Sequence, residues 1–371
     1  MRVRAALVAL LCAACADNLL PVARYTIEPE GRVERGARTL LRPSLDGIPA
    51  LSGGAAWRTG PDDAIRADSA TREGLWVTFL ATGAAQVEVE LGGRTTQRTF
   101  TVAPSPELVA VLRGPDGNAD LWRFALDGTG LTRLTTEPLD DVEPAAARGT
   151  DRIVFRSLRG GGSALWSMRR DGTDVRRLSA APADAQQPAL AQDGAALAFL
   201  AGDPPKLFAA AADGGGAARV TTTFGFPGSI EQVPAWLPGT TRLAFTSTDS
   251  VVSTVVLIDR TGTNPRRISG TAAAFQPAVS VGGRVAFVGL AANGRTRVRT
   301  WTAPDTLRTV TPVAEFDDAE PTWIGEERIA YVALVPGGAE LRVADLVYSR
   351  FGPRRIPLPA GVVPSQPEAL P

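Results

Sequence analysis

The chain has 371 residues, which exceeds the usual size of a single hydrophobic core, so we expect two domains. It carries 39 basic and 39 acidic residues, and this balance creates no overall field that would favour nucleic acid or an anionic membrane surface. Histidine is absent, which removes the commonest general base and transition-metal ligand.

Residues 1–16 predict an export signal. Two arginines precede an apolar run from Ala5 to Leu11, which is shorter than the roughly 20 residues that a membrane span needs. Two cleavage sites stay open. The segment from Leu11 to Cys15 resembles a bacterial lipobox, in which Cys15 becomes the lipid-acylated first residue, whereas Ala14 to Ala16 fits the ordinary signal of a free secreted protein. The rest of the chain has no cysteine, so we expect no disulfide.

Residues 20–103 predict a small β-domain. Apolar and polar residues alternate in short runs such as Val87 to Leu91, with Gly, Pro and Asp clusters between them, which is typical of strands joined by turns. The segment resembles the bacterial immunoglobulin-like domains of group 2, through landmarks that occur in the order Thr26–Pro29, Gly36, Trp57, Gly74–Val77, Gly83 and Val87–Gly93. The resemblance implies a two-sheet sandwich that serves as a spacer or an adhesion module, and we adopt the spacer interpretation.

Residues 107–371 contain a repeat of about 44 residues. A residue followed by proline recurs at intervals of 43 to 46, as Glu143-Pro144, Gln187-Pro188, Val233-Pro234, Gln276-Pro277, Glu320-Pro321 and Gln366-Pro367. An apolar strand starts eight or nine residues after each of the first five prolines, and another starts at Val109, ahead of them all. Four short strands in 40 to 45 residues is the size of a propeller blade, which must stack on its neighbours to bury both faces.

The best-preserved repeat is GNADLWRFALDGTGLTRLTT, from Gly117 to Thr136. It resembles the WD-like repeats of the TolB family of six-bladed propellers. Its Asp127-Gly128 turn recurs at Asp171-Gly172 and Asp213-Gly214, where it suits a tight hairpin. The predicted fold class is therefore all-β: an immunoglobulin-like sandwich followed by a six-bladed β-propeller.

The two ends of the repeat array are complementary. No landmark proline stands nine residues before Val109, so the first blade lacks its innermost strand. At the other end, Gln366-Pro367 begins an innermost strand with no further strands after it. We predict that the C-terminal strand completes the first blade and closes the ring.

The residues that precede the landmark prolines are expected to circle the mouth of a channel on the ring axis. Glu320 and Glu143 are then separated by Gln366 alone, which makes an acidic sector able to hold a cation or a basic peptide segment. The predicted partner-binding residues are Asp140, Asp141, Glu143, Gln187, Gln276, Asp317, Asp318, Glu320 and Gln366. The alternative is that these side chains only satisfy backbone donors where strands begin.

Catalytic motifs are missing from the sequence. Without histidine or a cysteine in the body of the chain, no Ser-His or Cys-His nucleophile can be assembled, and no phosphate-binding or dinucleotide-binding glycine pattern occurs. We expect no catalytic residue, metal or cofactor, and we assign Trp236 and Trp323 to the blade core rather than to a sugar-stacking site.

The leading functional hypothesis is a cell-envelope binding protein. It would be exported, lipid-anchored to a bacterial membrane so that it faces the periplasm or the cell surface, or else soluble in the periplasm or secreted. TolB-like proteins bind an envelope lipoprotein and peptide segments around the channel mouth, so the resemblance implies an envelope protein or peptide as partner, or one associated with the cell wall, and no nucleic acid. The alternatives are a carbohydrate-active propeller that uses paired carboxylates and a purely structural surface domain.

Overall fold

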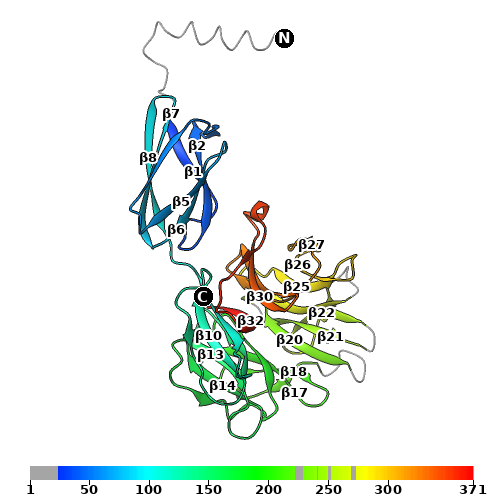
Figure 1. The fold of residues 1–371 in the computed structure, drawn as a ribbon. Coiled ribbons are helices and arrows are strands. Elements are labelled where there is room, and N and C mark those ends of the chain that lie inside the picture. The colour runs from blue at the N-terminus through cyan, green and yellow to red at the C-terminus, as the bar shows by residue number, and fades with distance from the viewer. Residues whose placement is uncertain (1–23, 222–228, 240, 250–251, 269–272, 371) are drawn as a thin grey trace. The chain divides into compact units, whose positions relative to one another are not determined.

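The computed structural model describes residues 24–221, 229–239, 241–249, 252–268 and 273–370. The predicted signal and Cys15 lie outside these ranges. The regular structure within them is strand, apart from one 3-10 turn, η2 (Ser349–Phe351), and no helix there has the length and apolar character needed to cross a membrane. The chain divides between Pro104 and Ser105 into two compact units (Figure 1).

The first unit consists of two antiparallel sheets around one core. One sheet has the strand order β1-β2-β6-β5, with β3 paired to β2, and the other has the order β4-β7-β8. The strands are β1 (Tyr25–Glu30), β2 (Arg38–Leu45), β3 (Ile48–Pro49), β4 (Ala56–Gly60), β5 (Ile65–Ala70), β6 (Leu75–Phe79), β7 (Gly83–Leu91) and β8 (Arg94–Val102). Because side chains alternate between the two faces of a strand, Leu75, Val77 and Phe79 all enter the core, where they meet Val87 and Val89 of the other sheet.

The second unit contains six four-stranded antiparallel sheets in its described residues. The first is made of β9 (Glu107–Arg113), β10 (Ala119–Ala125), β11 (Thr132–Arg133) and β32 (Val363–Leu370). The second is made of β12 (Asp141–Ala146), β13 (Arg152–Ser157), β14 (Ala164–Arg169) and β15 (Arg176–Arg177). The third is made of β16 (Gln186–Leu190), β17 (Ala196–Ala201), β18 (Lys206–Ala211) and β19 (Ala218–Arg219). The fourth and fifth are β20 (Ile230–Trp236), β21 (Arg242–Thr248), β22 (Ser253–Asp259), β23 (Arg266–Arg267), and β24 (Ala274–Val279), β25 (Val285–Leu290), β26 (Thr296–Thr302), β27 (Thr306–Thr309). The sixth is β28 (Asp317–Ile324), β29 (Arg328–Val335), β30 (Gly338–Asp345) and β31 (Arg354–Arg355).

The core of this unit lies between neighbouring sheets. In five of the six sheets the apolar second strand carries one aromatic side chain that is at most 1% exposed, and these residues are Phe155, Phe199, Phe245, Phe287 and Tyr331; β9 in the first sheet has none. Phe155, for example, packs with residues of the first and second sheets, and Phe199 with residues of the second and third. A single sheet could not bury both of its apolar faces, so the stacking of sheets supplies most of the hydrophobic stabilisation.

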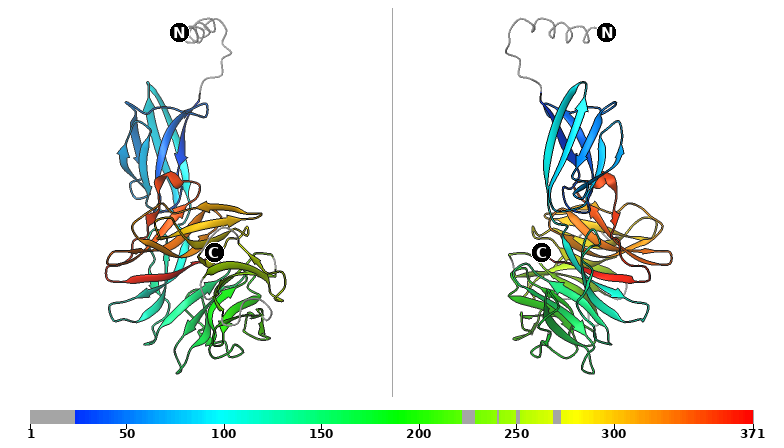
Figure 2. Two further views of the ribbon diagram at one scale, coloured as in Figure 1. Left: turned by 90° about the vertical axis from the view of Figure 1, so that its right-hand side faces the viewer. Right: turned by 60° about the vertical axis from the view of Figure 1, so that its left-hand side comes forward.

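The C-terminal strand closes the array of sheets. β32 pairs with β9 in antiparallel register, from Val363 opposite Arg113 to Leu370 opposite Glu107. The innermost strands contact one another in the cyclic order β12, β16, β20, β24, β28, β32, and β32 returns to β12. Figures 1 and 2 show the red C-terminal strand within the ring of sheets. This is the closure that the incomplete ends of the repeat predicted.

Candidate functional site

The residue before each landmark proline has an unusual backbone conformation. In all six, φ lies between 48° and 57°, in the left-handed region that L-residues other than glycine rarely adopt. The pairing of each innermost strand with its neighbour shifts register at the same place, as between Val142 and Ala145 in β12. The bulge therefore turns one side chain per sheet toward the ring axis at a defined height, and this side chain is polar in five of the six sheets.

Five of these residues bond to one another around the ring. Each uses its side-chain oxygen to accept the backbone N–H of the equivalent residue in the next sheet. The donor and acceptor pairs are Gln187 N to Glu143 Oε2 at 2.7 Å, Val233 N to Gln187 Oε1 at 2.6 Å, Glu320 N to Gln276 Oε1 at 2.9 Å, Gln366 N to Glu320 Oε2 at 2.6 Å and Glu143 N to Gln366 Oε1 at 2.8 Å. The side chains thus satisfy backbone donors, as the structural alternative expected, and their positions are set by the closed ring.

Val233 interrupts the ring because its side chain has no acceptor. The backbone N–H of Gln276 donates instead to Thr246 Oγ1 at 3.0 Å, from the adjacent strand β21. Thr246 is fully buried. Val233 also places a β-branched side chain at φ 48°, where a branched residue is more strained than an unbranched one.

We expect Val233→Gln to stabilise the protein by about 1 kcal/mol, because the amide restores the missing acceptor and the branched side chain is lost. Thr246→Val should lower the free energy of unfolding by about 1–3 kcal/mol in the natural chain, since it leaves the Gln276 N–H without an acceptor. The cost should be smaller in the Val233→Gln background. Urea unfolding of the four proteins measures this coupling, and Thr246→Ser, which keeps the hydroxyl, is the control. An equal cost in both backgrounds would contradict the ring.

Asp140 and Asp317 face the preceding sheet rather than the axis. Asp140 accepts the Ala119 N–H at 3.0 Å and pairs with Arg113 at 2.9 Å. Asp317 accepts the Thr296 N–H at 2.8 Å and pairs at 3.0 Å with Arg295, the residue before Thr296. The pKa of Asp140 is lowered, chiefly by its hydrogen bond from Arg113. The pKa of Asp317 is also lowered, chiefly by its hydrogen bond from the Thr296 N–H.

Asp141 and Asp318 are buried, at 0% and 2% exposure. Asp141 pairs with Arg159 at 2.6 Å, and Asp318 accepts the Thr311 hydroxyl at 2.5 Å. Burial raises the pKa of the Asp318 carboxyl. These two aspartates, like Asp140 and Asp317, do not line the axial cavity, because each lies before the bulge, where its carboxylate bonds to groups of the surrounding sheets.

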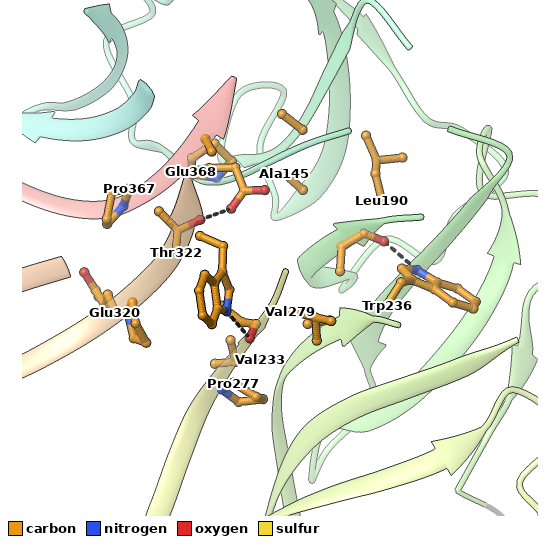
Figure 3. A pocket seen from close by; sticks show the side chains of 18 of the residues that line it. Ala145, Leu190, Val233, Trp236, Pro277, Val279, Glu320, Thr322, Pro367 and Glu368 are labelled. Carbon is orange, nitrogen blue, oxygen red and sulfur yellow. Dashed lines mark hydrogen bonds between the residues drawn. The ribbon is translucent and has the colours of Figure 1, made fainter. Parts of the chain in front are cut away.

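The inner strands of all six sheets enclose a cavity of about 910 Å³ on the ring axis (Figure 3). Of the predicted residues, the structure brings five together in its wall: Glu143, Gln187, Gln276, Glu320 and Gln366. Trp236 and Trp323 also border it but are only 5% and 6% exposed, and their indole N–H groups donate to the backbone oxygens of Ala189 and Ala278. They pack as core residues.

Glu368 is a cavity residue that the sequence reasoning missed. It lies immediately after the last landmark proline, and Figure 3 shows its side chain directed toward Thr322, whose hydroxyl lies 3.3 Å from Glu368 Oε2. Burial raises the pKa of Glu368 to about 7, and it also raises the pKa of Glu320. The available signal was the aligned position, since the residue after the proline is alanine or threonine in the other five repeats.

Metal ligands are not grouped in the part of the chain that the structure describes: no three His, Cys, Asp or Glu side chains there lie where they could share a metal ion. The cavity wall instead combines carboxylates and amides that already accept hydrogen bonds, a few arginine and hydroxyl groups, and apolar side chains. This arrangement suits the binding of a ligand or of a partner's side chain.

Four-stranded sheets stacked in a ring around an axial cavity define a β-propeller. The sequence matches no protein-family model and no curated protein. Among solved structures, it is similar to TolB from Acinetobacter baumannii, with a TM-score of 0.61 and 13% identity over 78% of this chain and 80% of that one. Putative TolB from Agrobacterium tumefaciens gives a TM-score of 0.54 and 11% identity over 68% and 89% of the two chains. A chain of a nidogen/laminin complex gives 0.56 and 11% over 71% and 98%. The likeness shows the fold, and it confirms the TolB-like β-propeller expected from the repeats.

Proposed function

We propose that this chain is an exported cell-envelope binding protein whose six-bladed propeller presents one end of its axial cavity to an envelope protein or peptide. The observation that carries the proposal is the cavity of about 910 Å³ to which all six inner strands contribute. Side chains held by mutual hydrogen bonds lose little conformational entropy on binding. The proposed binding end is the one that carries the ring of residues before the landmark prolines. The sequence resemblance to TolB-like proteins, which bind partners around the channel mouth, favours this end.

We also propose that the first unit is an immunoglobulin-like spacer and that Cys15 carries a lipid anchor. Two antiparallel sheets that share one core support the sandwich assignment. The Leu11 to Cys15 segment supports acylation. Labelled fatty acid should be incorporated by the natural chain and not by a Cys15→Ser variant, and label in both would refute the anchor.

Photocrosslinking in living cells tests the partner-binding face. Gln232 is the residue before Val233 in the chain, and its side chain is exposed and lines the cavity. A photoreactive residue there should yield a discrete adduct with an envelope component. Two control positions are each 38% exposed. Val281 follows the opposite end of an inner strand and lines the cavity there, whereas Val175 does not line the cavity.

The three positions separate the outcomes. An adduct from Gln232 alone supports the proposed face, whereas one from Val281 alone assigns binding to the other face and contradicts the proposal. Equal adducts from Val175 and Gln232 would mean nonspecific capture. Glu320→Gln then tests the role of charge, because the amide can accept a ring hydrogen bond as Gln187 and Gln276 do, and we expect a weaker adduct without any loss of thermal stability.

A further inference from the structure

One position in the inner wall differs in kind from its equivalents in the other sheets. The residue after the landmark proline is Ala145, Ala189, Ala235, Ala278 and Thr322 in five sheets and Glu368 in the one that closes the ring. All six line the cavity. Small side chains at this level leave the space in front of Glu368 open, so at this level the wall carries one long acidic side chain and otherwise only alanine and threonine.

Glu368 has no cationic partner among the described residues. Its hydrogen bonds come from the Thr322 hydroxyl and the backbone of Ala146. Arg148 and Arg328 also border the cavity, but neither is among the groups that shift the pKa of Glu368. Glu143, by contrast, is paired with Arg156 at 2.9 Å. Glu368 is half-buried, and a carboxylate that is partly withdrawn from water is stabilised by a nearby cation or by uptake of a proton, so Glu368 is suited to a cationic ligand as its counter-ion.

Glu320 adds a second carboxylate of the same kind. Its Oε2 accepts the Gln366 N–H, and no ion pair with a basic residue is formed in the described part of the chain. Glu320 and Glu368 lie on the neighbouring innermost strands β28 and β32. The cavity therefore has two carboxyl groups without an ion pair on one side, in a wall that also includes Leu190 and Val279.

We infer that the cavity binds an alkylammonium group, with Glu368 as its counter-ion and the apolar wall around its hydrocarbon chain. An ammonium head supplies three donors and one positive charge, and a hydrocarbon chain gains free energy when it leaves water for an apolar wall. A divalent metal ion fits less well, because calcium takes six to eight oxygen ligands and magnesium demands near-ideal octahedral geometry. The inference goes beyond the proposed function and stands even if no envelope partner is found.

Calorimetric titration of the purified protein with hexylammonium tests the inference. Hexan-1-ol, which has the same chain without the charge, is the ligand control. Hexylammonium should bind at least tenfold more tightly than hexan-1-ol at pH 8.5, and its affinity should fall at pH 5.5, where Glu368 is protonated. Equal binding of the two ligands, or no binding of hexylammonium, would overturn the inference without need of any variant.

Glu368→Gln identifies the carboxylate. The tenfold preference for hexylammonium should fall to less than threefold, with the folded state checked by circular dichroism. Glu340→Gln, which changes a half-buried glutamate outside the cavity, should keep the full preference. If Glu368→Gln kept it too, Glu368 would not be the counter-ion.

Two sources of the ammonium group are distinguished by one more titration. The tripeptide Ala-Lys-Ala with blocked ends presents a lysine side chain, and the same peptide acetylated on the lysine is its neutral control. Competition between the charged peptide and hexylammonium would mean that a partner's lysine can enter the cavity. Binding of hexylammonium alone would assign the cavity to a small amine.

Discussion

Removal of residues 365–371 is expected to lower the free energy of unfolding of the propeller by about 5 kcal/mol or more, which is comparable to the whole stability of an ordinary domain. The deletion takes away most of β32, so β9 loses its inner partner. Ala369 and Leu370 leave the apolar clusters on either side of the first sheet, and Gln366 leaves the ring of hydrogen bonds. Urea unfolding followed by circular dichroism measures the loss.

A rearranged chain is the control for this truncation. Leu370 lies opposite Glu107 in the register of the two strands, so residues 363–370 can be moved ahead of β9 and joined to Glu107 by a short turn. The rearranged protein keeps every strand and should recover most of the lost stability. If the truncated chain unfolds in the same urea concentration as the natural one, β32 does not close the ring.

Glu368→Gln should change the pH dependence of stability by about 3 kcal/mol. Burial raises the pKa of the carboxyl to about 7 in the folded protein, from 4.5. Folding therefore binds a proton between these two values, so the contribution of Glu368 to stability is fully present below pH 4.5 and is lost as the pH rises through 7. The variant carries no such charge, and we expect it to equal the natural protein near pH 4.5 and to exceed it at pH 8.

Unfolding titrations at several pH values measure this difference. Other carboxyls whose pKa is raised by removal from water, such as Glu231, Asp318 and Glu320, titrate in both proteins and cancel in the comparison. A constant offset between Glu368→Gln and the natural protein from pH 4.5 to 8 would contradict a buried, unpaired Glu368.

The ring of hydrogen bonds explains why an amide or carboxylate stands before five of the six landmark prolines. Gln187 and Glu143 have the same structural role, since each accepts a hydrogen bond from a backbone N–H of the next sheet with one side-chain oxygen. Polarity at these positions is thus needed for closure whether or not a partner binds. The negative charge of Glu320 and Glu368 is not needed for it, because an amide would accept the same bonds. A requirement for ligand binding would therefore show as negative charge at Glu320 and Glu368, and not as polarity alone.

Much of the candidate site was predictable from the sequence, and its chemistry was not. The proline landmarks placed Glu143, Gln187, Gln276, Glu320 and Gln366 at equivalent positions, and all five line the cavity. The four aspartates of the same segments were grouped with them because they are close in sequence. The bulge at each landmark separates the two sets, since it turns the residue before proline inward and leaves Asp141 and Asp318 buried against Arg159 and Thr311.

The sequence by itself determined the strands, the period and the closure of the ring. Alternating apolar residues and a proline every 43 to 46 residues are local signals, and the first and last repeats of the array lack complementary strands. The tertiary structure alone decided which polar groups share the axis and which of them have partners. These facts depend on left-handed backbone at six bulges and on contacts between residues as distant as Glu143 and Gln366. Burial and the lack of a counter-ion arise only when six sheets surround one side chain, so Glu368 became recognisable as a site only in the folded chain.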